Sequence, residues 1–369
     1  MSFSATDHAM MARALRLAER GAYTTRPNPM VGCVLAHGDE IVGEGWHRLA
    51  GEPHAEILAL QDAGDRAKGA TAYVTLEPCA HTGKTGPCAD ALVAAGVWRV
   101  VVAMRDPFPE VDGEGFARLA AAGIGVESGL MEAQARALNR GWLSLVERGR
   151  PWVRVKLATS IDGRTALASG DSKWISCEAS RLDGHRWRAR AGAIITGAGT
   201  VLADDPSLTV RLGDDTPFVA PLRVVLDPGL ATIARGRVRE GAAPALYLHA
   251  ADVKPPRDLS MQVSVELGVV PVRAGLIDLA AVLRRLAERG INEVQVEAGA
   301  TLAGGFLAAG LVDEILLYIA PVLLGERAKP LFDGLRIDDM AQKLNLTIVE
   351  SRAIGTDMRL LLRPAAPSA

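Results

Sequence analysis

The 369-residue sequence has few cysteines, few aromatic residues and no excess of charge of either sign. Its four cysteines are too few for a disulfide scaffold in a chain of this length. Aromatic residues make up 4%, and 41 Lys and Arg face 43 Asp and Glu, so neither the stacking platforms nor the basic surface of a nucleic-acid binder is present. We therefore expect a small-molecule partner and no nucleic acid.

Long hydrophobic runs are also missing. A bilayer span needs roughly 18 apolar residues, and the longest run, Ile315 to Leu324, is interrupted by Pro321. Near the start of the chain Thr6 is expected to cap a helix, and Asp7 with several arginines interrupts any apolar stretch of the secretory type. These features predict no membrane partner and a cytoplasmic location.

What the sequence does contain is apolar material in an α/β pattern. Hydrophobic residues make up 49%, and at roughly 150 residues per domain the length indicates two domains. Short β-rich runs alternate with helical runs from Val31 to about Gly129, which predicts a layered α/β domain with a largely parallel sheet. The polar segment Glu147–Pro151 precedes a new strand, so we place the domains at 1–148 and 149–369.

The expected elements follow from these runs and from the glycines that end helices, such as Gly96 and Gly123. In the first half the expected strands are Val31–Ala36, Glu40–Gly45, Ala72–Leu76, Arg99–Met104 and Ile124–Val126, with helices at Pro53–Ala63, Pro87–Ala95, Gly113–Ala122 and about Glu132–Val146. In the second half they are strands Trp152–Leu157, Ala193–Thr196, Leu222–Asp227, Ala245–His249, Glu293–Glu297 and Glu314–Ala320, with helices Leu279–Arg289 and Leu302–Ala309.

Four residues of the first half form a pattern typical of a catalytic zinc site. His54, Cys79 and Cys88 supply one imidazole and two thiolates, which leaves the fourth tetrahedral position for water. Zinc lowers the pKa of such a water toward about 7. Glu56, two residues after His54 near a predicted helix start, is expected to be the catalytic proton shuttle. The pattern predicts a zinc-dependent deaminase.

Prolines support the same interpretation. Pro78 and Pro87 each precede one of the two cysteines, and proline is favoured at the first helical position. We therefore expect both thiols near helix N-termini, where the partial positive charge favours the thiolate. Taken singly, each cysteine is better explained as an ordinary buried thiol, and the histidine as a surface residue; it is their joint pattern that indicates zinc.

One rival zinc ligand and the two remaining cysteines also need an interpretation. His81 lies two residues from Cys79 and is a rival zinc ligand to His54. Cys33 and Cys177 are expected to be small buried hydrophobic residues.

Longer motifs carry a resemblance to a known family. Nucleobase deaminases usually show Pro-Cys-x-x-Cys, whereas eight residues separate the cysteines here. The stretches Pro27–Cys33, Gly51–Glu56 and Glu77–Cys88 closely resemble the bacterial bifunctional riboflavin-biosynthesis deaminase–reductases, which usually carry a second proline at the position of Gly86. The resemblance covers essentially the whole chain.

This resemblance implies an α/β fold in two parts: an N-terminal cytidine-deaminase-like three-layer domain and a C-terminal dihydrofolate-reductase-like domain. It implies His54 as the zinc ligand. It also places Asn28 and His47 in loops of the base-binding pocket, although a solvated loop position is an equal alternative for both residues.

The second half contains a glycine-rich strand–turn–helix segment, Gln295–Gly305. Small residues there let a pyrophosphate approach backbone N–H groups at a helix N-terminus, although a tight turn explains the glycines equally well. Gly197–Thr200 is a weaker signal of the same kind. A ribose phosphate calls for arginine, and a predicted helix carries Arg181, Arg186, Arg188 and Arg190, with Arg211 downstream. At least two of these four are expected to form a solvated helix face.

The reductase half of the same family is resembled by Lys156–Arg164, Ser172–Ile175, Gly199–Pro206, Leu208–Arg211 and Glu297–Gly299. The resemblance implies NADPH binding by Ala158, Trp174, Thr200, Asp204, Gly299, Ala300, Thr301, Leu302, Ala303, Gly304 and Gly305. It implies substrate binding by Ser172, Arg188, Leu208, Arg211 and Glu297. Ala158-Thr159 and Pro228 depart from the Gly-Ala pair and the serine often found in the family, which leaves the preference for NADPH over NADH open.

The function that the resemblance implies uses Zn²⁺ and NADPH on a phosphorylated pyrimidine. The first half would remove the 2-amino group of 2,5-diamino-6-ribosylamino-4(3H)-pyrimidinone 5′-phosphate, and the second half would reduce the ribosyl group to ribityl, giving 5-amino-6-(5-phospho-ribitylamino)uracil. Lys156 and Asp204 are candidates to assist protonation.

Two rival functions are a nucleoside or tRNA deaminase with an accessory domain and a zinc-stabilised nucleotide-binding protein. The tRNA deaminase predicts a basic surface, which the composition lacks. The binding protein would hold its zinc with four protein ligands. The sequence leaves the oligomeric state open, a homo-oligomer included.

Overall fold

The computed structural model describes residues 3–80, 86–108, 111–241, 243–256 and 265–365. The chain divides into two compact units, Met1–Gly149 (unit 1) and Arg150–Ala369 (unit 2). Within the described ranges, no helix is both long and apolar enough to cross a membrane.

Unit 1 is built on one mixed sheet with strand order β2-β1-β3-β4-β5. Its elements are α1 (Ala5–Ala18), β1 (Gly32–His37), β2 (Glu40–Trp46), α2 (Ala55–Ala63), β3 (Thr71–Val74), α3 (Cys88–Ala94), β4 (Arg99–Val102), α4 (Glu114–Ala121), β5 (Gly125–Ser128), α5 (Glu132–Leu138) and α6 (Arg140–Arg148). Strands β3, β4 and β5 are parallel, as expected, but β1 is antiparallel to both neighbours. A tight turn at Gly38, with φ of 58°, joins β1 to β2 and forces them to pair as a hairpin.

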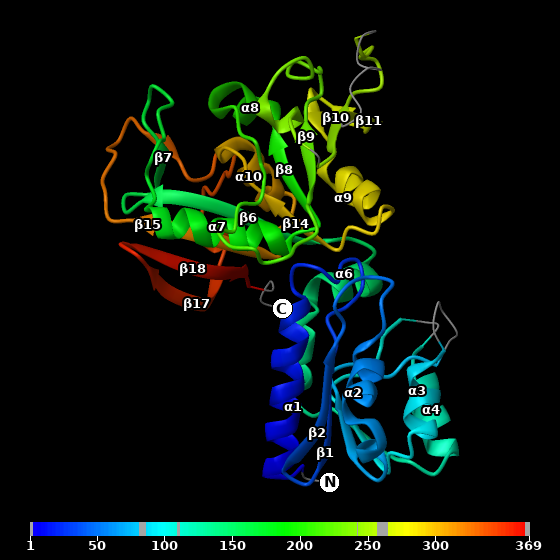
Figure 1. Cartoon of the computed structure of the whole chain (residues 1–369). Helices are drawn as coiled ribbons and strands as arrows, with labels where there is room; N and C mark the ends of the chain where they lie inside the picture. Colours follow the sequence, from blue (N-terminus) through cyan, green and yellow to red (C-terminus); the bar gives the residue numbers. More distant parts are fainter. Residues whose placement is uncertain (1–2, 81–85, 109–110, 242, 257–264, 366–369) are drawn as a thin grey trace. The chain divides into compact units, whose positions relative to one another are not determined.

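The expected three layers are present in unit 1. Side chains alternate across β1, so Cys33 and Leu35 pack against α2, α3 and α4, whereas Val34 and Ala36 pack against α1 and the α5–α6 segment. Figure 1 shows α1 on one face of the sheet and α2 to α4 on the other. Both faces of this sheet are therefore covered by helices.

Two glycines of β2 set how closely α2 approaches the sheet. A Cβ at Gly43 would lie 2.3 Å from the carbonyl oxygen of Ala59, and one at Gly45 would lie 2.2 Å from that of Ala55. Any side chain at either position would collide with the backbone of α2. The absence of a side chain at these two positions therefore lets α2 approach the strand, and it sets where the helix begins.

The start of α1 differs from the prediction. Ser4, not Thr6, is the N-cap: its hydroxyl accepts the N–H of Asp7, whose carboxylate accepts the Ser4 N–H in return. The Thr6 hydroxyl instead donates to Asp39 at 2.6 Å. Two neighbouring hydroxyl residues both suit a cap, and the reciprocal partner at Asp7 decides between them.

Asp7 also joins α1 to the sheet through a buried polar network. Its carboxylate accepts hydrogen bonds from the Tyr73 hydroxyl of β3 at 2.8 Å and from the Arg99 guanidinium of β4 at 2.7 Å. Arg99 also pairs with Glu127 of β5 at 2.8 Å. Burial raises the pKa of Asp7, but the bonds from Arg99, Ser4 and Tyr73 outweigh burial and hold that pKa well below its usual range.

The single helix predicted at about Glu132–Val146 is two helices, α5 and α6, separated at Asn139. Asn139 has φ of −97° and ψ of 20° and is 2% exposed. Its side-chain oxygen accepts the Met30 N–H at 2.8 Å, and its amide donates to the Met30 carbonyl at 2.9 Å. These two bonds satisfy a backbone segment that has no other secondary structure, and the helix breaks to allow them.

Unit 2 is built on a longer sheet with strand order β11-β10-β9-β8-β14-β6-β15-β18-β17. Its main elements are β6 (Trp152–Ser160), β7 (Arg164–Ala166), α7 (Glu178–Arg190), β8 (Ala193–Gly197), α8 (Ala198–Asp204), β9 (Leu222–Leu226), β10 (Ala245–His249), β11 (Val265–Val269), α9 (Leu279–Ala287), β14 (Glu293–Val296), α10 (Ala300–Ala308), β15 (Glu314–Ala320), β17 (Leu346–Ile354) and β18 (Asp357–Pro364). Strands β12 (Val272–Arg273), β13 (Leu276–Ile277) and β16 (Lys329–Pro330) form small ladders.

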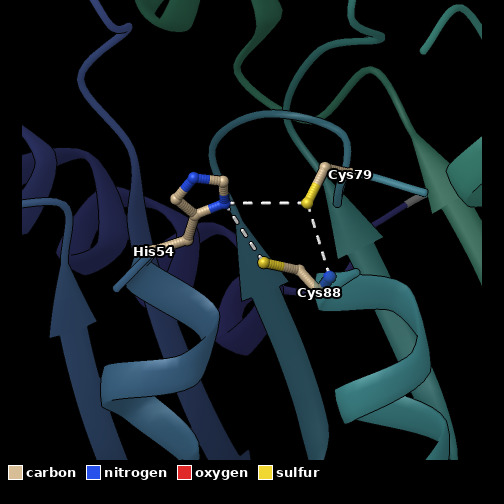
Figure 2. Close-up of side chains that lie close together, drawn as sticks. All are labelled: His54, Cys79 and Cys88. Carbon is tan, nitrogen blue, oxygen red and sulfur yellow. Dashed lines mark hydrogen bonds between the residues drawn. The ribbon is translucent and has the colours of Figure 1, made fainter. Parts of the chain in front are cut away.

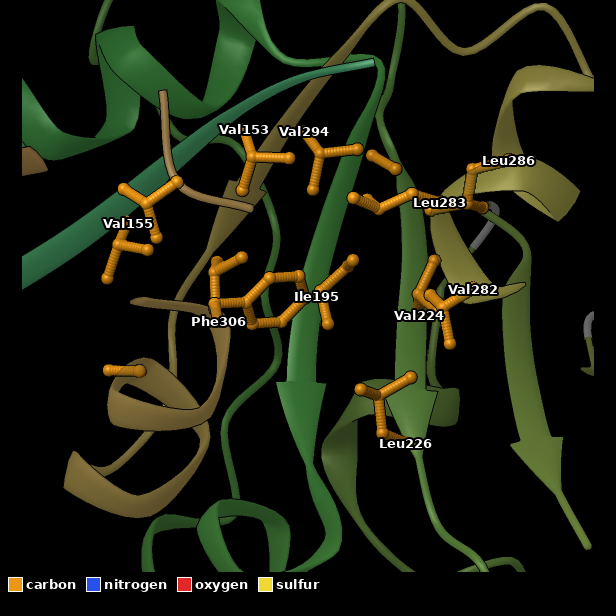
Figure 3. Packing of buried hydrophobic residues seen from close by; sticks show 14 of the residues in the cluster. Val153, Val155, Ile195, Val224, Leu226, Val282, Leu283, Leu286, Val294 and Phe306 are labelled. Carbon is orange, nitrogen blue, oxygen red and sulfur yellow. The ribbon is translucent and has the colours of Figure 1, made fainter. Parts of the chain in front are cut away.

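The main core of unit 2 lies between the sheet and helices α9 and α10. Val153, Ile195, Val294 and Phe306 are fully buried there, and Figure 3 shows the Phe306 ring of α10 packed against the strand side chains. Helix α7 covers the opposite face, where Trp187 packs against a smaller apolar cluster. The hairpin β17–β18 was not predicted, because β17 is exposed over nearly its whole length and lacks a clear apolar alternation.

Parallel strands bring three predicted motifs to one edge of the sheet. Strands β6, β8 and β14 are parallel neighbours, so their carboxyl ends lie at the same edge. The segments that follow them are Ser160–Arg164, Gly197–Thr200 and Glu297–Gly305. Ligands of open α/β sheets bind at this edge, and the reductase motifs therefore meet where such a site is expected.

Candidate active sites

The three expected zinc ligands come from the ends of different elements of unit 1. His54 is the N-cap of α2, and Cys88 is the first residue of α3. Pro87 is the N-cap of α3 rather than its first helical residue. Cys79 lies in the segment after β3 and begins no helix of its own, but the backbone N–H of Cys88 donates to its Sγ at 3.4 Å, so both thiols lie at the N-terminus of α3.

Geometry brings these ligands together at the spacing that zinc requires. The Nδ1 atom of His54 lies 3.6 Å from the Sγ of Cys79 and 3.3 Å from the Sγ of Cys88, and the three ligand atoms lie within 4.8 Å of one another (Figure 2). With zinc–nitrogen bonds of about 2.0–2.1 Å and zinc–sulfur bonds of about 2.3 Å, tetrahedral ligands of these types stand roughly 3.6 Å apart. The donor set and its spacing therefore fit a zinc ion.

Glu56 lies in the first turn of α2 and is 3% exposed. Its Oε2 atom has no hydrogen-bond partner among the residues that the structure describes. Burial, with a smaller contribution from Cys79, raises the pKa of the carboxyl to about 7. A buried carboxylate oxygen without a protein partner beside three ligands is the arrangement that a proton shuttle requires.

Next to this site are the two loop residues of the expected base pocket. His47 is 3% exposed, and its ring lies edge-on to that of His54 with centroids 5.3 Å apart. Its Nδ1 lies 3.3 Å from the carbonyl of Pro53, and its Nε2 lies 3.1 Å from the side-chain amide of Asn28. Burial and the charge of His54 lower the pKa of His47. His47 is thus not a solvated loop residue.

Sequence reasoning missed Glu77, which organises the segment carrying Cys79. The Glu77 carboxylate is buried and accepts backbone N–H groups from Gly115 at 3.0 Å and Gly113 at 3.2 Å, with further bonds from Asp106 and Phe116. An acidic residue directly before a Pro-Cys pair was the available signal. The rival ligand His81 lies outside the described residues.

In unit 2, two expected substrate residues form an ion pair with each other. The Nε and Nη2 atoms of Arg188 donate to the two carboxylate oxygens of Glu297 at 2.6 and 2.7 Å, and Arg188 Nη1 donates to the carbonyl of Thr209. Burial raises the pKa of Glu297, but Arg188 outweighs it and brings that pKa to about 2. The pair links α7 to the end of β14.

The glycine-rich turn expected to bind the cofactor lies beside the Gly197–Thr200 segment. The N–H of Gly299, the N-cap of α10, donates to the Thr200 hydroxyl of α8 at 3.2 Å. A Cβ at Gly199 or Gly299 would meet no heavy atom within 4 Å, so the space beside both glycines is open. This cradle at a helix N-terminus fits the phosphates of a dinucleotide.

Not all residues of that turn face the open side. Ala303 is fully buried in the core, and a Cβ at Gly304 would lie 1.9 Å from the carbonyl oxygen of Asp333. Their small size is explained by packing within unit 2. Ala300, Thr301, Leu302 and Gly305 are exposed or partly buried.

Of the remaining residues predicted for the reductase site, some lie close together and others are buried in the core. Trp174 is 70% exposed, with the Arg181 guanidinium 4.7 Å from its ring centroid. Lys173 donates to the carbonyl of Asp204, which brings the Ser172–Trp174 segment beside α8. Leu208 is 3% exposed, so its side chain packs in the core and only its backbone is left for a ligand. Ala158 packs against the small apolar cluster that Trp187 also contacts.

Two sequence expectations are wrong, one for the arginines of α7 and one for Cys177. Of the four arginines on α7 only Arg186 is exposed, because indole rings lie against Arg181 and Arg190 and Arg188 pairs with Glu297. Cys33 is fully buried as expected, but Cys177 is only half-buried, and its thiol lies 3.3 Å from the carbonyl of Ile354.

Comparisons with known proteins agree with both halves. The cytidine and deoxycytidylate deaminase zinc-binding region matches residues 4–104, and the RibD C-terminal domain matches residues 151–360. The riboflavin biosynthesis protein RibD of Escherichia coli (strain K12) is 46% identical, covering 96% of this chain and 99% of that protein. Its counterpart in Haemophilus influenzae is 44% identical, with 99% of each chain covered.

Solved structures give the same result. Acinetobacter baumannii RibD, form 1, superposes with a TM-score of 0.90 at 44% identity, covering 98% of this chain and 99% of that one. A deaminase/reductase from Thermotoga maritima superposes with a TM-score of 0.87 at 32% identity, with the same coverage. The expected cytidine-deaminase-like and dihydrofolate-reductase-like fold class is confirmed.

A zinc-binding deaminase domain followed by a reductase domain defines a bifunctional enzyme, both hydrolase and oxidoreductase. Neither rival function accounts for both matches. The chain belongs to the RibD family, the bifunctional deaminases and reductases of riboflavin biosynthesis.

Proposed function

We propose that unit 1 deaminates 2,5-diamino-6-ribosylamino-4(3H)-pyrimidinone 5′-phosphate and that unit 2 reduces the ribosyl group of the product with NADPH. A phosphorylated pyrimidine fits an enzyme of this kind. The observation that carries the proposal is the convergence of His54, Cys79 and Cys88 beside the buried Glu56. The Thermotoga maritima relative bears the names of the same two activities.

At the deaminase site His54, Cys79 and Cys88 would hold the zinc ion. When bound there, zinc lowers the pKa of water toward about 7, which makes a nucleophile available at neutral pH. Glu56 takes the proton from the attacking water on Oε2 and passes it to the departing amino group, which leaves as ammonia. The Asn28 side chain orients the pyrimidine by hydrogen bonds, and the neutral His47 ring holds that side chain in place through Nε2.

At the reductase site the open turn from Gly299 to Leu302, with Thr200, would hold the cofactor phosphates. Trp174, Ala158 and Asp204 complete the cofactor contacts, and bound NADPH supplies the hydride. Ser172, Arg188, Leu208, Arg211 and Glu297 would hold the substrate, with Leu208 acting through its backbone. The exposed Arg211 guanidinium suits the ribose 5′-phosphate.

The proposal includes a cytoplasmic location and a homo-oligomeric assembly, because both substrates and NADPH are small soluble molecules and enzymes are commonly symmetric oligomers. The domains would be 1–148 and 149–369, and the two compact units support a boundary at this position.

The direct test supplies the diaminopyrimidinone phosphate to purified, zinc-loaded protein with and without NADPH. We expect ammonia release in both cases and a fall in absorbance at 340 nm only when NADPH is present. Reduction without ammonia release would contradict the assigned order of the two reactions.

A further inference from the structure

His185 of α7 has no role in the sites described above, yet it contacts one of their residues. Its Nδ1 atom accepts the backbone N–H of Arg211 at 3.1 Å. A ring nitrogen that accepts a hydrogen bond carries no proton, so the imidazole is neutral and its proton is on Nε2. Burial and the neighbouring charges of Arg188 and Arg211 lower the pKa of His185 to about 4, which keeps this state across the physiological range.

The same face of α7 holds the Arg211 segment at a second point. Arg188 lies three residues after His185, which places both side chains on one side of the helix. Arg188 Nη1 donates to the carbonyl of Thr209 at 2.9 Å, while its other nitrogens hold Glu297. The backbone from Thr209 to Arg211 is therefore bound to α7 at both ends.

Arg211 itself is a cation without an opposite charge. Its guanidinium is exposed and donates to the hydroxyls of Ser207 at 3.3 Å and Thr209 at 2.9 Å, and none of the ion pairs in the described part of the chain includes it. Burial and the positive charges of Arg188 and Arg237 lower its pKa. An arginine in a field of like charge is ready to receive an anion.

We propose that His185 is a positioning residue of the reductase: by accepting the N–H of Arg211 it fixes the backbone from which that guanidinium reaches the phosphate of the substrate. The inference rests on the proposed function of unit 2. Because the contact is to the backbone, the requirement at position 185 is an acceptor at the place of Nδ1 and not a donor or a charge.

Three substitutions in the full-length, zinc-loaded protein separate these requirements. His185→Asn puts an amide oxygen near the position of Nδ1, His185→Gln offers a donor near the position of Nε2, and His185→Ala offers neither. Loss of one hydrogen bond corresponds to about a 3- to 10-fold change in an equilibrium constant. We expect His185→Ala and His185→Gln to raise KM for the phosphorylated substrate by about this factor, and His185→Asn to stay within about twofold of the unchanged enzyme.

The other kinetic constants are the controls. The kcat of reduction, KM for NADPH and the deaminase rate of the same protein should not change. With the dephosphorylated substrate, the Gln variant and the unchanged enzyme should have the same KM. Three results would overturn the inference: an equal rise of KM for the dephosphorylated substrate, an equal rise of KM for NADPH, or a KM for the phosphorylated substrate that is as high in the Asn variant as in the Gln variant. The Asn and Gln pair decides the question even if the Ala variant does not fold.

Arg211→Ala distinguishes this inference from the proposed function. If Arg211→Ala leaves KM for the phosphorylated substrate unchanged, the assigned phosphate contact itself is wrong. If Arg211→Ala raises KM strongly while the Gln and Ala variants of His185 match the unchanged enzyme, only the positioning role of His185 is wrong.

Discussion

The backbone N–H of Cys88 lies 3.4 Å from the Sγ of Cys79. The first turn of α3 therefore acts on both zinc-ligand sulfurs, although only Cys88 belongs to the helix. Hydrogen bonds from Cys88 and His54 lower the pKa of the Cys79 thiol. Metal binding requires a thiolate, and the hydrogen bond from the Cys88 N–H favours the thiolate form of Cys79 although Cys79 lies in a loop.

Glu56→Gln should abolish ammonia release and leave reduction intact. Glutamine keeps the shape of the side chain but cannot carry the proton, and a general acid or base contributes about 10²- to 10⁴-fold to a rate. Ammonia release from the diamino substrate and absorbance at 340 nm with the deaminated substrate measure the two activities separately. Loss of both activities in a folded variant would show that the sites are not independent.

Removal of zinc should also abolish deamination and leave reduction intact. A chelator should stop ammonia release, because water at the site then returns to an ordinary pKa, whereas NADPH oxidation with the deaminated substrate should continue. Addition of zinc should restore the first activity. If chelation also stopped reduction, the metal would have a role in unit 2 that none of its described residues indicates.

Gly45→Ala should weaken zinc binding without a change to any ligand. The added Cβ would lie 2.2 Å from the Ala55 carbonyl oxygen, so the first turn of α2 must move. Overpacking of this kind costs about 1–3 kcal/mol in the free energy of unfolding. Gly125→Ala is the matched control, since its Cβ would meet nothing closer than 3.9 Å. Urea denaturation and chelator competition for zinc measure both effects, and equal results for the two variants would contradict the packing argument.

Asp7→Asn should destabilise the protein in a pH-dependent way. The folded-state pKa of Asp7 lies below its unfolded value of about 3.9, so its stabilising effect is present above that pH and is lost as the pH falls through the lower folded value. We expect a loss of about 1–3 kcal/mol in the free energy of unfolding at pH 7 and a shrinking difference below pH 4. Urea denaturation at several pH values tests this.

The control for Asp7 is an exposed ion pair in the same unit. Asp90 pairs with Arg118 at 2.9 Å, but its side chain is 53% exposed, so Asp90→Asn should change the free energy of unfolding very little. A loss for Asp90→Asn as large as that for Asp7→Asn would mean that burial of the Asp7 network is not the cause.

Arg188→Met should destabilise unit 2 by more than the loss of one contact. It leaves the largely buried Glu297 carboxylate without its main cation, a change that costs about 3–5 kcal/mol. The double variant Arg188→Met with Glu297→Gln should recover part of this, because the uncompensated carboxylate is then removed as well. Urea denaturation of the single and double variants measures the coupling, and strictly additive losses would contradict it.

The zinc site was predictable because its ligands are marked locally. A histidine followed two residues later by glutamate, and prolines directly before both cysteines, identify His54, Glu56, Cys79 and Cys88 without knowledge of distant contacts. The same holds for the strands of unit 1 and for the turn at Gly299. These features depend on residues that are close together in the sequence, so the sequence alone is enough to predict them.

The features that were missed depend on partners far away in the chain. The break at Asn139 follows from two bonds to Met30, 109 residues earlier. The pairing of Arg188 with Glu297 joins residues that the motifs treated separately. The burial of Leu208 reflects packing between elements of unit 2, and no spacing rule contains that information.

Asn139 also has a consequence for how the enzyme would respond to random mutation. It fixes both polar groups of the Met30 backbone, two positions after Asn28, for which we propose contact with the pyrimidine. A saturation screen that selects only for ammonia release should therefore rank position 139 with the residues of the pocket, although no ligand touches it. A screen that selects only for reduction should pass over it.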